Sequence, residues 1–209
     1  MTKDQQTWRK EFKGEVKSTV AAPKPSTAAT NKKPLKKKKV GLPILEYQER
    51  GTKWVIENHD RDTAKAISES GLLEVEISDP KQQVYIYNCE GVTIKIKGAK
   101  FKSIIVDKCV KVNVIFPTII SGCEIVNSKK IAVQTEGICP VFTIDKTVGV
   151  SVYLSKETAD ISSFTTSMSS EMNVSIPDGD DYKEIPIPEQ FFHKITDGNL
   201  TSEVSELYR

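Results

Sequence analysis

Residues that could act as catalytic groups are few and dispersed in this chain of 209 residues. Only two histidines occur, His59 and His193, and neither lies in the spacing with Cys, Ser or Asp that a nucleophilic or metal site needs. His59 is predicted to be a turn residue. No Gly-x-x-x-x-Gly-Lys loop or Gly-x-Gly-x-x-Gly fingerprint is present, so no nucleotide-binding motif is present either. We therefore expect no catalytic residue and no cofactor.

One dense acidic group occurs, Asp178-Gly179-Asp180-Asp181. Paired carboxylates are the catalytic groups of most glycosidases, and several oxygens together suit calcium. A Pro-Asp-Gly sequence is first of all a turn signal, however. We expect a turn here, with no metal bound and no glycosidase activity, and a loose calcium site is the alternative.

The four cysteines, Cys89, Cys109, Cys123 and Cys139, lie far apart and form no Cys-x-x-Cys pair. Zinc and redox motifs both require closer spacing. We expect four buried free thiols that fill space as small apolar side chains. Cys89 and Cys109 occupy equivalent positions of a repeat, so stacking would bring them near each other.

The charge is distributed unevenly along the chain. Residues 1–43 carry twelve Lys and Arg against three Asp and Glu, whereas residues 44–209 carry eighteen against twenty-five. A net acidic body argues against nucleic-acid binding, which depends on clustered basic residues. No apolar run approaches the roughly 20 residues that span a bilayer, and the first residues contain no apolar signal core. We expect a cytoplasmic protein without a membrane span.

Residues 1–41 are predicted to be a disordered basic tail, because Ser, Thr, Ala, Pro and Lys dominate from residue 18 onward and bury little apolar surface. Trp8 and Phe12, four residues apart, would share one side of a short helix if a groove were offered. The run Lys36 to Lys39 is a solvated tether, an acidic-partner contact or a localisation signal. The composition changes at Leu42, where the folded domain, residues 42–209, is predicted to begin.

The strongest pattern is a repeat in residues 84–177. Five segments align at steps of 20, 19, 19 and 22 residues, each with a small residue followed by two apolar residues separated by one polar residue. The aligned small residues are Cys89, Cys109, Ser128, Thr147 and Ser169. Such segments are short strands with one face inward, and stacking them in parallel gives a continuous core. An antiparallel sandwich also spaces strands regularly, but it does not explain why one residue class recurs at each position.

The resulting expectation is an all-β parallel solenoid that needs caps at both ends. The segment around Trp54, with Trp54 facing inward, is a candidate for the first cap. Ile185 to Phe192 is predicted to be extended, because each Pro disfavours helix in the residue before it. Asn199 to Leu207 fits either strand or helix.

Lysines mark the outward positions of the ladder. One group clusters at a single turn, Lys95, Lys97, Lys100 and Lys102, and another recurs on later rungs, Lys108, Lys111, Lys129, Lys130 and Lys146. Lysine on exposed strands is first a device for solubility and edge protection. As a group, these lysines could form a weakly positive face for an acidic protein.

Several stretches resemble the C-terminal domain of cyclase-associated proteins over about residues 42–209. The most specific are Ser169-Ser170-Glu171-Met172-Asn173 and Pro188-Glu189-Gln190-Phe191; Val84 to Cys89, Ile94 to Gly98, Val106 to Cys109, Asn127-Ser128 and Tyr153 to Ser155 agree as well. Met168 departs from the lysine expected there. Thr2 to Thr7 looks like the end of a WASP-homology actin-binding motif, whose amphipathic helix would lie before Met1.

The resemblance implies a right-handed parallel β-helix with a C-terminal strand or hairpin exchanged in a homodimer. It implies binding to monomeric actin, preferring the ADP form and promoting exchange to ATP, with cofilin-bound actin as a further partner and a cytoskeleton-associated location. A dimeric scaffold or a monomer-sequestering protein without exchange activity is the alternative. A related fold occurs in tubulin-folding cofactor C and its relatives, which resemble GTPase activators and rely on an arginine finger. Residues 84–177 contain no arginine, which argues against that alternative.

Two sets of residues are predicted on this basis. The actin-binding set is Lys108, Asn127, Lys129, Lys146, Glu171 and Asn173 on the ladder, with Glu203 and Glu206 near the end of the chain. The dimerisation set, within residues 178–209, is Ile187, Phe191, Leu200, Val204 and Leu207.

Overall fold

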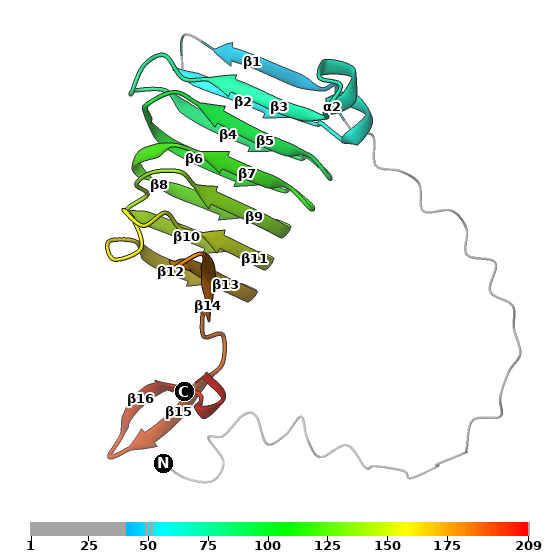
Figure 1. The fold of residues 1–209 in the computed structure, drawn as a ribbon. Coiled ribbons are helices and arrows are strands. Elements are labelled where there is room, and N and C mark those ends of the chain that lie inside the picture. Colours follow the sequence, from blue (N-terminus) through cyan, green and yellow to red (C-terminus); the bar gives the residue numbers. More distant parts are fainter. Residues whose placement is uncertain (1–40, 49, 51, 209) are drawn as a thin grey trace, which may run out of the picture. The chain divides into compact units, whose positions relative to one another are not determined.

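The computed structural model describes residues 41–48, 50 and 52–208. The predicted tail, with Trp8, Phe12 and the lysine run, lies outside the described residues except for Gly41. The described part is almost wholly β-strand, with one α-helix and one 3-10 helix. Its main body is a parallel β-solenoid, which confirms the fold that the repeat predicts (Figure 1).

Two sheets of seven strands form the walls of the solenoid. The first sheet contains, in spatial order, β1 (Ile44–Gln48), β2 (Lys53–Glu57), β4 (Gln83–Tyr87), β6 (Lys100–Asp107), β8 (Thr118–Val126), β10 (Val141–Asp145) and β12 (Ser163–Ser167). The second contains β14 (Asp181–Pro186), β13 (Ser170–Asp178), β11 (Val148–Tyr153), β9 (Lys129–Thr135), β7 (Asn113–Phe116), β5 (Thr93–Lys97) and β3 (Leu72–Glu76). The chain therefore alternates between the sheets, one strand in each per turn.

Three further elements complete the described chain. Helix α2 (Arg61–Ile67) connects β2 to β3. Asp60 caps its start, because the Asp60 side chain accepts a hydrogen bond from the Thr63 backbone N–H at 2.9 Å. The strands β15 (Phe191–Thr196) and β16 (Asn199–Val204) form a two-stranded antiparallel hairpin, followed by the 3-10 helix η3 (Glu206–Tyr208).

The rungs stack in register. Val84 pairs with Ile104, Ile104 with Cys123, Cys123 with Phe142, and Phe142 with Phe164. Because side chains alternate between the faces of a strand, the whole column points inward. Its first four members are at most 1% exposed. Identical inward positions on successive rungs therefore make the core.

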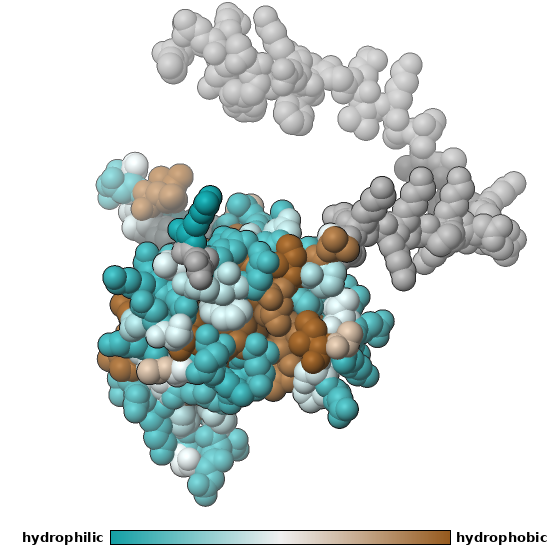
Figure 2. All heavy atoms as spheres, turned by 90° about the horizontal axis from the view of Figure 1, so that it is seen from above, coloured by the Kyte–Doolittle hydropathy of each residue, from teal (hydrophilic) through white to brown (hydrophobic). Residues whose placement is uncertain are grey.

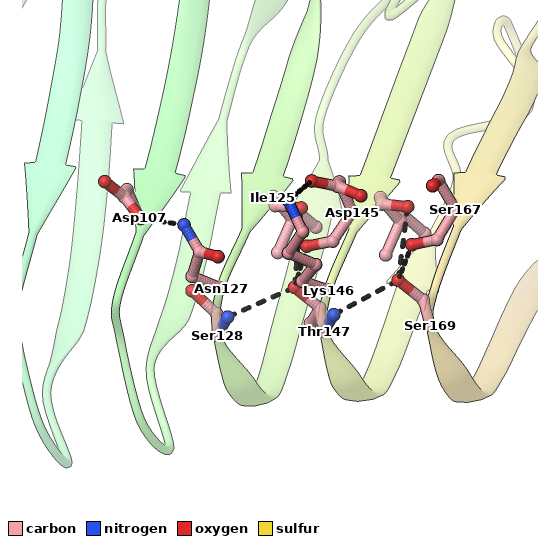
Figure 3. A network of polar contacts seen from close by, with 10 residues as sticks. Asp107, Ile125, Asn127, Ser128, Asp145, Lys146, Thr147, Ser167 and Ser169 are labelled. Carbon is pink, nitrogen blue, oxygen red and sulfur yellow. Dashed lines mark hydrogen bonds and ion pairs between the residues drawn. The ribbon is translucent and has the colours of Figure 1, made fainter.

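A hydrogen-bonded column runs through the same core at the small residues of the repeat. The Ser128 N–H donates to Thr147 Oγ1 at 3.2 Å, and the Thr147 N–H donates to Ser169 Oγ at 3.1 Å (Figure 3). The Thr147 hydroxyl in turn donates to the Asp145 carbonyl at 2.9 Å. These residues are small because each must fit inside a corner and pair with backbone groups that the corner removes from the strand ladder.

Thr147→Val is expected to destabilise the solenoid by about 1–3 kcal/mol, because it keeps the shape of a fully buried side chain but leaves the Ser128 N–H without an acceptor. Urea unfolding followed by circular dichroism measures this loss. Thr147→Ser keeps the hydroxyl and is expected to cost less. Equal stability of Thr147→Val and the parent chain would show that the hydrogen-bonded column contributes nothing.

All four cysteines are buried and free, as predicted. Cys89 and Cys109 lie on neighbouring rungs, where the Val110 N–H bonds the Cys89 carbonyl at 2.9 Å. A hydrogen bond with the Cys89 thiol, together with burial, raises the pKa of Cys109. Burial also raises the pKa of Cys123 well above its usual range and that of Cys139 to about 12. The thiols of Cys109, Cys123 and Cys139 are therefore protonated at neutral pH and poorly nucleophilic.

Both ends of the solenoid carry an antiparallel strand. β1 pairs with β2 at one end and β14 pairs with β13 at the other. Trp54 in β2 packs against the core, as predicted. The ladder begins one rung before Val84, because β2 and β3 stack on β4 and β5. Helix α2 lengthens this first rung, so the 19-residue spacing does not reveal it.

The acidic group is a turn, as expected. Asp178 and Asp181 face each other across the β13–β14 hairpin, and Gly179 has a φ of 63°. Among the described residues, no group of three or more His, Cys, Asp and Glu could hold a metal ion. No helix in this same part of the chain is long and apolar enough to cross a membrane.

Candidate functional site

One corner of the solenoid, between the first sheet and the second, holds two left-handed residues on each rung, three positions apart. The first position is Asn88, Lys108, Asn127, Lys146 and Met168, with φ of 51°, 54°, 51°, 48° and 50°. The second is Gly91, Lys111, Lys130, Gly149 and Glu171, with φ of 68°, 55°, 55°, 77° and 56°.

The left-handed conformation selects against most side chains. It costs an L-residue about 1–2 kcal/mol, and Gly, Asn and Asp are the residues that tolerate it. Asn and Gly occupy several of these positions, as this cost predicts. Lysine occupies four of them, Lys108, Lys111, Lys130 and Lys146. Strained positions that keep an unfavourable residue type are candidates for function.

We call this surface the lysine corner. It comprises Lys108, Lys111, Asn127, Lys129, Lys130 and Lys146. Successive rungs of a sheet lie about 4.8 Å apart, so the positive charges follow one another closely along the corner. Lys129 lies between the left-handed Asn127 and Lys130 of its rung and is exposed. Its backbone forms a parallel bridge with Val110 of the preceding rung and pairs with Val148 of the following rung.

Three side chains of the corner are held by the rung before them or by a neighbour. Lys108 Nζ lies 3.0 Å from the Tyr87 hydroxyl oxygen and 5.0 Å from the centre of its ring. Asn127 donates to an Asp107 carboxylate oxygen at 3.0 Å, and Lys146 pairs with Asp145 at 3.3 Å (Figure 3). These contacts orient the outer edge of the corner.

Tyr85 beside the corner stays neutral and Lys108 stays charged at physiological pH. Burial, with the nearby Asp107 carboxylate, raises the pKa of Tyr85 to about 12. The hydrogen bond to Tyr87 raises the pKa of Lys108, because it stabilises the ammonium form. Lys108 is therefore a fixed positive charge.

The two lysine groups differ in how they are neutralised. On the second sheet, Lys95 pairs with Glu136 at 3.0 Å and Lys97 pairs with Glu74 at 2.7 Å. Lys111, Lys129 and Lys130 of the lysine corner form no ion pair with any described residue. Within the lysine corner, only Lys146 has an ion-pair partner among the described residues, so most of its positive charge is uncompensated.

A shallow hollow adjoins the corner at Gly149. Lys130 lines it on one rung, and Glu171 and Asn173 line it on another. A Cβ at Gly149 would lie 3.5 Å from the Lys130 Cα, and the φ of 77° disfavours any side chain there. The hollow brings the two predicted residues of β13 next to the lysine corner.

Six of the eight predicted actin-binding residues thus lie together: the four on the lysine corner, with Glu171 and Asn173 beside it. Glu203 and Glu206 belong to the C-terminal segment and lie apart from the corner. Lys111 and Lys130 were predicted as part of the positive face but not of the actin-binding set, and Gly149 was in neither, although Gly at one repeat position signals the left-handed conformation.

The predicted dimerisation residues have different surroundings. Phe191, Leu200 and Leu207 are 48%, 66% and 82% exposed. Val204 is half-buried in the hairpin, where it pairs with Phe191. Ile187 packs against the core of the solenoid, and its N–H bonds the Met172 carbonyl at 2.8 Å.

The two histidines lie in different elements and do not form a common catalytic or metal site among the described residues. His193 lies on the exposed hairpin, 2.8 Å from the Ser202 hydroxyl. His59 follows β2 in a corner, but it is only 2% exposed, so the turn interpretation missed its burial. The physical reason is that His59 takes the inward corner position which small residues occupy on later rungs.

Comparison with known proteins identifies the family. The family model described as "Adenylate cyclase associated (CAP) C terminal" matches residues 43–207. Adenylyl cyclase-associated protein 2 of Rattus norvegicus is 39% identical over 196 residues, which cover 93% of this chain and 38% of that protein. Cyclase-associated protein 1 of Arabidopsis thaliana is 38% identical over 172 residues, or 80% of this chain and 34% of that protein.

A solved structure of a cyclase-associated protein supports the same family. The crystal structure of cyclase-associated protein from Cryptosporidium parvum matches with a TM-score of 0.70 and 31% identity, covering 79% of this chain and 96% of that one. The chain spans well under half the length of the rat and Arabidopsis relatives. The chain belongs to the adenylate cyclase-associated protein C-terminal family.

Proposed function

We propose that this chain binds monomeric actin through the lysine corner and the adjoining Glu171 and Asn173, prefers the ADP form, and promotes exchange to ATP. One observation carries the proposal: lysines occupy four left-handed positions where Asn or Gly would cost less. A charged contact with an acidic partner would account for lysine at these positions. Family membership supports the choice of actin as that partner.

The chain acts in this proposal as a binding module rather than an enzyme. Contacts at the corner hold the nucleotide cleft of actin in a state from which ADP leaves readily, so the chemistry belongs to actin. A binding protein can shift the conformational equilibrium of actin only by as much as its affinities for the two actin conformations differ. Cofilin-bound actin is a further partner, and the activity places the protein with the cytoskeleton in the cytoplasm.

A nucleotide-release assay tests this function. Monomeric actin is loaded with a fluorescent ADP analogue, and release of the analogue into excess ATP is followed with and without micromolar amounts of the chain. We expect acceleration that saturates with concentration. Binding without acceleration would favour a monomer-sequestering protein, and absence of binding would favour a structural scaffold; either result contradicts the exchange function.

We also propose that the chain forms a homodimer by exchanging its C-terminal hairpin. An isolated two-stranded hairpin is marginally stable in water. Every residue of β15 is exposed, and so are all of β16 except the half-buried Val204. The large apolar residues on this segment include Phe192 and Ile195, which are 61% and 74% exposed. A second copy would cover this apolar surface.

Removal of residues 191–209 is expected to convert the dimer into a monomer in sedimentation velocity. The cut keeps Ile187 and Glu189, which bond β13, so the solenoid stays closed at that end. Unchanged urea unfolding of the solenoid is the control. A shortened chain that still sediments as a dimer would refute the exchange of the hairpin.

A further inference from the structure

The two ends of the solenoid are completed in different ways. At the first rung, Leu42 and Ile67 are 85% and 52% exposed, and Figure 2, which views the molecule from above, shows apolar surface across this end. At the last rung, formed by β12 and β13, the chain returns along β14 and then bonds β13 through residues 187–189. We call residues 187–189 the closing segment. The last rung thus has polar groups bonded to it where the repeat itself ends.

One bond of the closing segment reproduces a backbone contact between earlier rungs. The Asn113 N–H donates to the Val92 carbonyl of the preceding rung at 3.0 Å. Met172 holds the same place in the last rung as Val92 does in its own, three residues after the small residue of the repeat. The Met172 carbonyl accepts from the Ile187 N–H at 2.8 Å. Ile187 therefore donates where a following rung would donate.

The other bond replaces a backbone acceptor with a side chain. On earlier rungs, the N–H of the second left-handed residue donates to a carbonyl of the following rung. These pairs are Gly91 with Val110 and Lys111 with Lys129, each at 2.9 Å. Glu171 holds this position on the last rung, with a φ of 56°, and its N–H donates to Glu189 Oε2 at 2.8 Å. The Glu189 carboxylate thus stands in for the carbonyl of a rung that does not follow.

This bond holds a residue of the proposed actin site. Glu171 lines the hollow beside the lysine corner together with Lys130 and Asn173. The left-handed conformation is unfavourable for Glu, and Glu171 is exposed on the last rung, where no further strand fixes its backbone. Without the bond to Glu189, residue 171 would relax toward the right-handed region. Its side chain would then turn out of the hollow.

We propose that Glu189 is a positioning residue of the actin site, because its carboxylate holds Glu171 in the conformation that directs the Glu171 side chain to the hollow. The inference rests on the proposed binding of actin by the corner. The same bond joins the two stretches with the most specific resemblance, Ser169 to Asn173 and Pro188 to Phe191. Glu189 acts in this account through Glu171 and does not itself touch actin.

Variants of the full chain test the role of Glu189 by fluorescence titration of ADP-actin. Glu189→Ala removes the acceptor and is expected to weaken binding by about three- to tenfold. Glu189→Gln keeps an acceptor oxygen and should bind like the parent chain. In a Glu171→Ala background, Glu189→Ala should cause no further loss, because two residues that act through one contact are not additive.

Hydrogen exchange tests the same bond without actin. In ¹H–¹⁵N NMR of Glu189→Ala, we expect the Glu171 amide to exchange at least about fivefold faster than in the parent chain. Glu184→Ala is the matched control, since it removes an exposed carboxylate from β14. It should leave both actin binding and exchange of the Glu171 amide unchanged.

The outcomes separate this inference from the proposed function. If the parent chain binds actin and Glu189→Ala binds equally well, Glu189 has no positioning role, and actin binding by the corner still stands. Equal losses in Glu189→Ala and Glu189→Gln, or additive losses with Glu171→Ala, would mean that Glu189 touches actin directly, which also overturns the inference. A parent chain that does not bind actin would contradict the proposed function and this inference together.

Discussion

The triple variant Lys129→Gln, Lys130→Gly, Lys146→Asn is expected to lose at least about tenfold in apparent affinity for ADP-actin, because it removes three neighbouring charges from the lysine corner. It should remain folded and be at least as stable as the parent chain. Gly and Asn tolerate the left-handed conformation of residues 130 and 146, whose φ values are 55° and 48°. Binding and stability are thus predicted to change in opposite directions.

A matched control separates position from net charge. Lys100→Gln, Lys102→Gln and Lys156→Gln also remove three exposed lysines, and none of them lies on the lysine corner. This control is expected to retain nucleotide exchange. Fluorescence titration of actin and urea unfolding of both variants give the two readouts. Equal losses in both variants would mean that net charge, and not the corner, controls binding.

Phe142→Ala is expected to destabilise the solenoid by about 3–5 kcal/mol. The Phe142 ring is fully buried and stacks on Phe164 of the next rung, with ring centres 5.0 Å apart and an angle of 7° between the planes. Alanine leaves a cavity that the regular stack cannot close, because neighbouring rungs are fixed in register. The midpoint of urea unfolding should fall accordingly.

Ile120→Ala is the control for this loss. Ile120 is also a large apolar residue of the first sheet, but it is 51% exposed. We expect a change within about 0.5 kcal/mol for such a surface position. A similar destabilisation by both substitutions would contradict the view that inward columns hold the solenoid together.

The parallel ladder could be predicted because its cause is local and repeated. Each rung carries the same inward pattern, as at Val92 and Ile94, and stacking is the arrangement that buries every copy. The first rung escaped detection because α2 interrupts the spacing between β2 and β3. The local sequence pattern could not decide between strand and helix for Asn199 to Leu207, because a strand and a 3-10 helix follow each other there.

The candidate site was only partly predictable. Lysine spacing placed Lys108 and Lys146 at equivalent repeat positions, but periodicity does not give backbone torsion angles. Left-handed conformation at Lys111 and Lys130 depends on how the chain turns between the sheets. The pairing of Lys95 with Glu136, forty-one residues apart in sequence, likewise depends on stacking of distant rungs.

By itself, the sequence determined the solenoid, its inward columns and the burial of its cysteines, because these follow from side-chain type repeated at a fixed interval. Only the tertiary structure decided which lysines remain uncompensated, and only it revealed the bond between Glu171 and Glu189 at the last rung. The physical reason is that charge compensation and hydrogen bonding depend on distances of a few ångströms between residues on different rungs. Those distances are set by the turns at each corner, which a repeat length does not specify.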